Sequence, residues 1–273
     1  MKKISYTEIQ TYLDCQKKHE WSYIKGASYT TPHFDFGSMA HKVLETRKIP
    51  NEALYPELKD YFGIASWENY FTQIFKELDI FLQDYNILHR ELYVETEELK
   101  GVIDLVVEHK ETKKITLLDY KFTSHYKDLI DIQTDQQLYV YVYLWQKYSG
   151  NKSLDVNIGY ISIPKYELLP PRVLKSGALS KDKAQKTTYN LYLESIEKLG
   201  LNIEDYKDIL DDIKNKTVLN TLTIGVNYDR FVNVIVNIMN VIKDMQKGYV
   251  LEVFDSYKCR NCPFVEVCKN VKI

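Results

Sequence analysis

Two aspartates, Asp104 and Asp119, and the nearby Lys121 have the residue types and the spacing for metal-dependent chemistry. They lie in two stretches with a period of two, residues 101–109 and 115–121, which predict the strands of a hairpin. If the polar turn between the strands is centred between Glu111 and Thr112, Asp104 lies opposite Asp119. Their Cβ atoms would then be about 5 Å apart, where like charges repel. Lys121 shares the strand face of Asp119. A divalent cation held between the two carboxylates would remove the repulsion.

The same residues have a simpler interpretation. An Asp-x-Lys tripeptide is often an exposed strand end with a surface ion pair, which contributes little to stability. The opposed Asp104 argues against this interpretation, although a single β-bulge in either strand would shift the register.

The four cysteines are a second candidate for metal chemistry. Cys15 stands alone near the N-terminus, and Cys259, Cys262 and Cys268 form a C-x2-C-x5-C cluster near the C-terminus. Disulfide frameworks are typical of small secreted domains, so we expect a four-thiolate site that joins the two ends of the chain. Such a site suits Zn²⁺ or a [4Fe–4S] cluster, and spacing alone does not distinguish them.

The composition is that of an ordinary globular protein. The chain has 273 residues, of which 45% are hydrophobic and 27% charged. The N-terminus has no apolar signal region, and no apolar run approaches the roughly 20 residues of a membrane span. We therefore expect a cytoplasmic protein without a membrane partner. The net charge of −2 gives no overall attraction to nucleic acid, so any such binding needs a local basic patch.

The chain is expected to form a single domain. Ser5 is a candidate N-cap, with Glu8 completing a capping box. Further helices are expected from about Gly37 and over residues 67–82, 131–148 and 231–245, and further strands over 156–163 and 221–226. We divide the domain into a helical N-terminal region with Cys15 (1–90), a catalytic core (91–165), a helical insertion (166–218) and a C-terminal strand, helix and cluster-binding region (219–273).

Four short motifs occur in a fixed order along the chain. They are G-x-x-x-H at Gly37–His41, G-x-x-D at Gly101–Asp104, D-x-K at Asp119–Lys121 and Q-x-x-x-Y at Gln137–Tyr141. Together they resemble the core motifs of RecB-type PD-(D/E)XK nucleases. The split cysteines resemble the iron–sulfur subgroup, which includes CRISPR adaptation nucleases and phage-encoded exonucleases. The resemblance extends from Cys15 to Cys268.

The resemblance implies an α/β fold: a PD-(D/E)XK restriction-endonuclease-like core with a central mixed β-sheet flanked by helices. A helical N-terminal region and a four-cysteine cluster would join the N- and C-terminal parts. The implied cofactors are Mg²⁺ or Mn²⁺ and a [4Fe–4S] cluster, with Zn²⁺ as the alternative at the cysteines. The implied metal ligands are His41, Asp104, Asp119 and the carbonyl of Tyr120. Lys121 would orient the attacking water, with Gln137 and Tyr141 in support.

Several other polar residues have competing interpretations. His41 alone would be a capping or surface residue, and its place in the motif makes it a ligand. Glu91 and Glu95 precede the first strand, where a solvated charge is favoured over a second-metal role. Segment 172–187 is either a solvated insertion or a basic lip that contacts the nucleic acid backbone. Its candidate DNA contacts are Arg172, Lys175, Lys181, Lys183 and Lys186.

The resulting expectation is a metal-dependent DNA nuclease. It would be an exonuclease acting on single-stranded ends in recombination, repair or phage DNA metabolism, with a helicase or recombination protein as a candidate partner. Two other classes are considered: a non-catalytic nucleic-acid-binding scaffold of the same fold, and a zinc-stabilised protein-interaction module. Cleavage polarity and oligomeric state are left open by the sequence.

Overall fold

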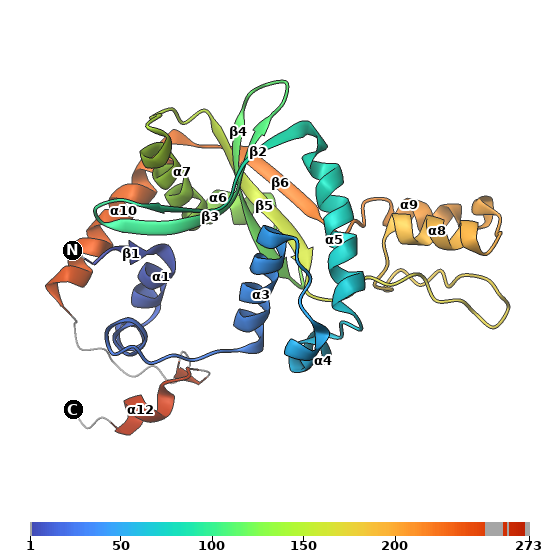
Figure 1. Cartoon of the computed structure of the whole chain (residues 1–273), viewed down its shortest axis with the longest axis horizontal. Helices are drawn as coiled ribbons and strands as arrows, with labels where there is room; N and C mark the ends of the chain where they lie inside the picture. The colour runs from blue at the N-terminus through green and yellow to red at the C-terminus, as the bar shows by residue number, and fades with distance from the viewer. Residues whose placement is uncertain (1, 249–258, 261, 271–273) are drawn as a thin grey trace.

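A mixed β-sheet with helices on both faces forms the body of the protein in a computed structural model (Figure 1). The structure describes residues 2–248, 259–260 and 262–270. The strands are β1 (Ile4–Ser5), β2 (Tyr85–Glu95), β3 (Leu99–His109), β4 (Ile115–Thr123), β5 (Val156–Pro164) and β6 (Asn220–Gly225). The helices are α1 (Tyr6–Asp14), α2 (Gln16–His19), α3 (Pro32–Thr46), α4 (Pro56–Phe62), α5 (Trp67–Phe81), α6 (Leu129–Thr134), α7 (Gln136–Ser149), α8 (Tyr189–Lys198), α9 (Lys207–Ile213), α10 (Tyr228–Lys247) and α12 (Val265–Asn270). The expected α/β fold with a central mixed sheet is confirmed.

The sheet combines parallel and antiparallel pairs. Its strand order is β1-β3-β4-β5-β6, and β2 also pairs with β3. The β1–β3 and β4–β5 pairs are parallel and the others antiparallel. Parallel neighbours need a crossover connection, and α6 and α7 supply it between β4 and β5. This crossover carries α7 across the sheet face beside the end of β4.

Two apolar clusters lie on the two faces of the sheet. Helices α3, α4 and α5 pack on one face around fully buried aromatic side chains that include Phe36, Trp67 and Phe71. Helices α1, α6, α7 and α10 pack on the other around Tyr139 and Tyr160. The hydrophobic effect thus fixes α3 and α7 on opposite faces of β3 and β4. Within the described part of the chain, no helix is long and apolar enough to cross a membrane.

The prediction of a single helix over residues 131–148 is wrong in one respect: the structure has two helices there, α6 and α7. Asp135 has an extended backbone (φ −71°, ψ 114°) and ends α6. Its side chain accepts a hydrogen bond from the Gln137 backbone N–H at 2.7 Å and so begins α7 as an N-cap. An aspartate that caps a new helix is more stable in this extended conformation than inside a continuous one.

The N-terminal region is less purely helical than predicted. Ile4–Ser5 adds a short strand to β3, and β2 begins at Tyr85 rather than near Glu91. Ser5 caps α1 as predicted, accepting from the Glu8 backbone N–H at 3.2 Å. The Glu8 side chain is buried and pairs with His19 and Lys2. Helix α3 begins earlier than expected, at Pro32, because Thr31 caps it and proline suits the first turn.

Residues 166–218, named here the arm, project from one end of the sheet (Figure 1). The arm has its own small core, which includes Leu179, Tyr192 and Ile209. Only its second half is helical, in α8 and α9, whereas the first half is an extended loop with one bridge between Val173 and Leu179.

Candidate active site

Three of the site's side chains converge from one helix and two strands. They are His41 of α3, Glu91 of β2 and Asp104 of β3, whose ligand atoms lie within 4.8 Å of one another. His41 Nδ1 is 3.3 Å from Glu91 Oε1 and 3.5 Å from Asp104 Oδ2. An imidazole and two carboxylates are the donor set for a hard divalent cation such as Mn²⁺ or Mg²⁺.

Asp104 lies where strands β3 and β4 separate. The ladder between them has the predicted register, with Leu105 opposite Leu118, and this is its last pair on the Asp104 side. Beyond that pair the Asp104 carboxylate accepts a hydrogen bond from the Tyr120 backbone N–H at 2.8 Å. The Tyr120 N–H is thus bonded to a side chain of β3 rather than to its backbone. The predicted backbone pairing of Asp104 with Asp119 is not part of the ladder.

A ring of side-chain contacts surrounds Asp119 on the other side of the site. Lys121 Nζ is 2.7 Å from Asp119 Oδ2 and donates to Gln137 Oε1 at 3.1 Å. Gln137 Nε2 donates to the Tyr141 hydroxyl at 2.7 Å, and that hydroxyl donates to Asp119 Oδ1 at 3.1 Å. The ring joins β4 to α7 and brings together all four residues that the D-x-K and Q-x-x-x-Y motifs predicted.

In the absence of a metal cation, the electrostatics of the site favour the protonated forms of Asp104 and His41. Burial, followed by the Asp119 charge, raises the pKa of Asp104 well above its ordinary value. Burial lowers the pKa of His41, but the hydrogen bond with Glu91 and the Asp104 charge outweigh it and raise this pKa to about 9. The imidazolium of His41 therefore occupies, as a positive charge, the place between carboxylates that a cation would take.

Lys121 and Tyr141 both keep their protons. Burial acts to lower the pKa of Lys121, yet the Asp119 charge holds this pKa above its ordinary value. Burial and the nearby carboxylates raise the pKa of Tyr141 well above its ordinary value. Lys121 is thus suited to donate hydrogen bonds and supply positive charge, and is not poised as a base.

A further layer of contacts holds α7 in position. Asp135 caps this helix two residues before Gln137, and its second oxygen accepts a hydrogen bond from the Tyr160 hydroxyl of β5. The Lys121 ammonium lies 5.5 Å from the centre of the Tyr160 ring. The start of α7 is thereby tied to the same strand surface that carries Lys121.

The glycines of two motifs have different roles. A Cβ added to Gly101 would lie 2.7 Å from Leu144 Cδ1 of α7, so this glycine allows the helix to pack closely on β3. A Cβ added to Gly37 would meet nothing within 4 Å. Glycine inside a helix costs roughly 1 kcal/mol relative to alanine, so Gly37 lowers the helix propensity of α3 at a position where the structure has room for a side chain.

The motifs and this geometry agree with a comparison of known families. Residues 3–269 match the PD-(D/E)XK nuclease superfamily. The chain belongs to this superfamily of nucleases.

Solved structures with a likeness to this nuclease are remote in sequence. The protein SSO0001 is 13% identical, with 81% of this chain and 80% of that chain aligned and a TM-score of 0.34. A protein from Eubacterium rectale, proposed to be an exonuclease, is 11% identical over 96% of this chain and 93% of that chain, with a TM-score of 0.39. No curated protein matches the sequence.

Glu91 is the residue of the nuclease site that the sequence interpretation placed wrongly, as a solvated charge. Its side chain is 22% exposed and contacts His41. The backbone at Glu91 has a φ of 47°, although it lies within a strand. A non-glycine residue in the left-handed region is strained by about 1–3 kcal/mol, and such strain is concentrated at active sites. The turn at residues 96–99 contains the missed signal, because a hairpin centred there places Glu91 opposite Asp104.

The cysteines of the nuclease lie near one another but not at single-ion spacing. Phe264, within the C-terminal cluster, stacks on Trp21 at 6.5 Å and meets Tyr29 edge-on at 5.4 Å. Lys17 lies close enough to Cys15 and Cys268 for both to raise its pKa, after the larger contribution of its hydrogen bond with Glu20. All four cysteines are among the described residues, and no three of their sulfurs come within 4.8 Å of one another. Tetrahedral Zn–S bonds of about 2.3 Å would place the sulfurs roughly 3.8 Å apart.

The five basic residues of segment 172–187 that are predicted to contact DNA are in different environments. Lys183 forms an ion pair with Asp212 at 2.5 Å. Lys181 and Lys186 lie over the rings of tyrosines, at 5.5 Å and 4.7 Å from the ring centres. Among the described residues, the side chains of Arg172 and Lys175 have neither an ion pair nor a ring contact, whereas Lys181 and Lys186 have a ring contact but no ion pair.

Proposed function

We propose that this nuclease is a Mg²⁺- or Mn²⁺-dependent deoxyribonuclease. It would act as an exonuclease on single-stranded DNA ends, in recombination, repair or phage DNA metabolism. The observation that carries the proposal is the convergence of His41, Glu91 and Asp104 beside the ring of contacts that holds Lys121. A non-catalytic scaffold would not need a strained Glu91 or a buried pair of aspartates, so the scaffold alternative is disfavoured.

The donor set fits a divalent cation. Asp119 Oδ2 is buried and has the Lys121 ammonium at 2.7 Å, but accepts no hydrogen bond. We infer that His41, Glu91 and Asp104 hold the cation, together with Asp119 and the Tyr120 carbonyl. A cation there would polarise the phosphate and activate water for phosphodiester hydrolysis.

The remaining residues would position the reactants. Lys121, kept protonated by Asp119, would orient the attacking water and stabilise the charge that develops on the phosphate. Gln137 would fix the direction of the ammonium through its 3.1 Å hydrogen bond, and Tyr141 would fix Gln137. Arg172 and Lys175 of the arm would contact the DNA backbone.

We further propose that Cys15, Cys259, Cys262 and Cys268 hold a [4Fe–4S] cluster with a structural role. The support for a cluster over zinc is the spacing of one cysteine near the N-terminus and three near the C-terminus, whereas zinc sites usually come as two close pairs. Reduced thiols in this site are consistent with the cytoplasm. A helicase or recombination protein would be the partner that supplies single-stranded ends.

End-labelled single- and double-stranded DNA, labelled at each end in turn and incubated with Mg²⁺ or Mn²⁺, tests the reaction. Mononucleotide release from single-stranded ends is expected, and Asp119→Ala and Lys121→Ala should abolish it while leaving the fold intact. Full metal-dependent activity in either variant would refute the assignment of these residues. RNA substrates in the same assay test the preference for DNA.

A further inference from the structure

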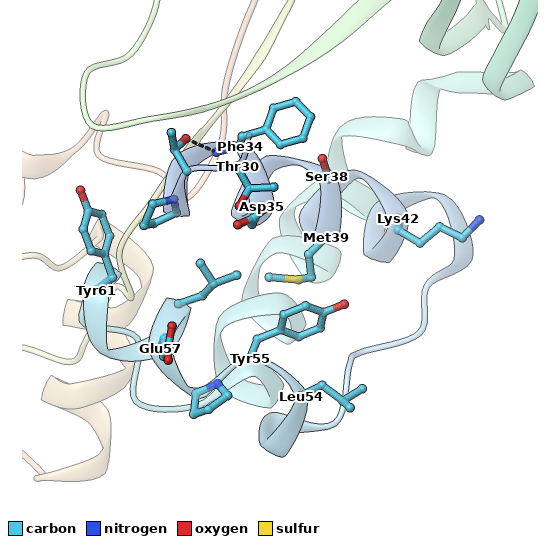
Figure 2. A pocket seen from close by; sticks show the side chains of 14 residues that line it. Thr30, Phe34, Asp35, Ser38, Met39, Lys42, Leu54, Tyr55, Glu57 and Tyr61 are labelled. Carbon is cyan, nitrogen blue, oxygen red and sulfur yellow. Dashed lines mark hydrogen bonds between the residues drawn. The ribbon is translucent and has the colours of Figure 1, made fainter. Parts of the chain in front are cut away.

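A pocket of about 910 Å³ lies between α4 and α3, the helix that also carries His41. Figure 2 shows Tyr61 and Phe34 on one side of this pocket and Leu54 on another, with Met39 and Tyr55 between them. The outer side chains are unusually exposed, at 63% for Phe34, 57% for Tyr61 and 67% for Leu54. Pockets of this size lined by aromatic groups are typical ligand sites.

The pocket and the metal site share one helix. Phe34, Gly37 and His41 have the i, i+3, i+7 spacing of a single stripe along α3. Phe34 lies about 10 Å from His41 along the helix, at 1.5 Å per residue. A single strand bound along this stripe would therefore span only a small number of nucleotides between His41 and Phe34. Between them the surface is open at Gly37, so a nucleic acid backbone can pass close to the helix.

The charges of the pocket favour bases over phosphates. Asp35 and Glu57 both line it and would repel a phosphate. The ammonium of Lys42, which also lines it, is 2.6 Å from Glu45 in an exposed ion pair. Carboxylates can accept hydrogen bonds from the amino groups of bases, and aromatic rings stack with unpaired bases.

We propose that this pocket binds one or more unpaired bases of the strand being cleaved, close to the scissile phosphate. This inference rests on the proposed function and makes it more specific, because a single strand offers its bases without the unpairing that a duplex would require. Tyr61 is held ready to stack by its edge-on contacts with Phe62, at 4.9 Å, and His33, at 5.5 Å.

The test combines a protein change with a DNA change. Binding is measured in the Lys121→Ala background with single-stranded oligonucleotides of about 12 nucleotides, within the usual range of single-strand sites. Phe34→Ala with Tyr61→Ala should weaken binding about ten-fold or more. An abasic substitution is moved along the oligonucleotide one position at a time, and at the position that occupies the pocket it should weaken binding to the protein with intact Phe34 and Tyr61 by a similar factor. The two changes together should then cost no more than either alone.

Tyr228→Ala is the matched control, because this tyrosine is 67% exposed on α10 and lies outside the pocket. It should leave the affinity unchanged. Fully multiplicative effects of the two changes, or unchanged affinity in the Phe34→Ala, Tyr61→Ala protein, would overturn the inference. A change in oligomeric mass with unchanged affinity would also overturn it, since the pocket would then be an interface between copies.

The outcomes separate this inference from the catalytic proposal. If the wild-type protein cleaves no substrate but the two changes are non-additive, base binding stands and the proposed reaction falls. If cleavage is metal-dependent but the effects multiply, only the pocket assignment falls.

Discussion

The Lys121 ammonium has two partners, the Asp119 carboxylate at 2.7 Å and the Gln137 side-chain oxygen at 3.1 Å. Because its pKa is held above the ordinary value, Lys121 acts as a fixed cation rather than as a base. We predict that Lys121→Ala lowers the single-turnover rate about 10²- to 10³-fold, as does the loss of one preorganised donor in other enzymes. Thermal unfolding should show a protein as stable as the wild type, or nearly so. A rate within a few-fold of wild type would contradict this role.

His41 predicts how metal affinity depends on pH. The imidazolium form is favoured in the metal-free protein because the pKa is raised to about 9. A metal ligand must be neutral, so binding releases this proton. The apparent Mn²⁺ affinity should therefore increase up to about ten-fold per pH unit between pH 7 and 9. Calorimetry in buffers of different ionisation enthalpy would count the protons, and a pH-independent affinity would contradict the prediction.

The raised pKa of His41 also determines how the stability of the metal-free protein depends on pH. The folded pKa of His41 is raised above the ordinary 6.5, so its stabilising effect is complete below about pH 6.5. The effect is lost as the pH rises towards 9, where the imidazole becomes neutral. Metal-free protein should thus lose this contribution over that interval, while protein saturated with Mn²⁺ should not.

At the scale of elements, the break at Asp135 aligns α7 with the active site. Asp135→Ala removes the N-cap of this helix, which should cost about 0.5–2 kcal/mol in the free energy of unfolding. The rate should also fall, because Gln137 lies two residues after the cap. Asp135→Asn keeps a capping oxygen and should restore most of both. Urea unfolding and single-turnover rates measure the two effects, and an alanine variant as stable and active as wild type would refute them.

How well each element could be predicted depended on how local its cause is. The β3–β4 register was predictable because a short turn fixes it, as the Leu105–Leu118 pair confirms. The break at Asp135 was not, since the residues around it fit helical spacing and only its cap and the Tyr160 contact select the extended form. The position of Glu91 opposite Asp104 follows from the turn at residues 96–99, but its left-handed backbone is a tertiary feature that no residue pattern predicts. The pocket beside α3 forms from two helices whose packing is a tertiary effect.

At the scale of the whole molecule, the proposed DNA contacts of the arm, Arg172 and Lys175, lie outside the sheet and its covering helices. Arg172→Gln with Lys175→Gln should reduce the dependence of binding on salt, because each phosphate contact to a single strand contributes about 0.7 to the logarithmic slope. The expected decrease for two contacts is about 1.4. Lys183→Gln is the matched control, since this lysine is paired with Asp212 and should leave the slope unchanged. An unchanged slope in the double variant would show that the arm does not contact the backbone.

Cys15 lies between α1 and α2, and Cys268 lies in α12, at the opposite side of the molecule from the arm (Figure 1). A cluster held there would stabilise the fold without touching the substrate, because the donors of the catalytic site lie on α3, β2 and β3. Cys268→Ala should remove the iron, measured by metal analysis and by the brown absorption of an anaerobic preparation. It should also lower the thermal midpoint by on the order of 10 °C. Asp119→Ala should retain both the iron and the stability and lose only cleavage. A colourless wild-type protein with stoichiometric zinc would instead assign the four thiolates to a zinc site.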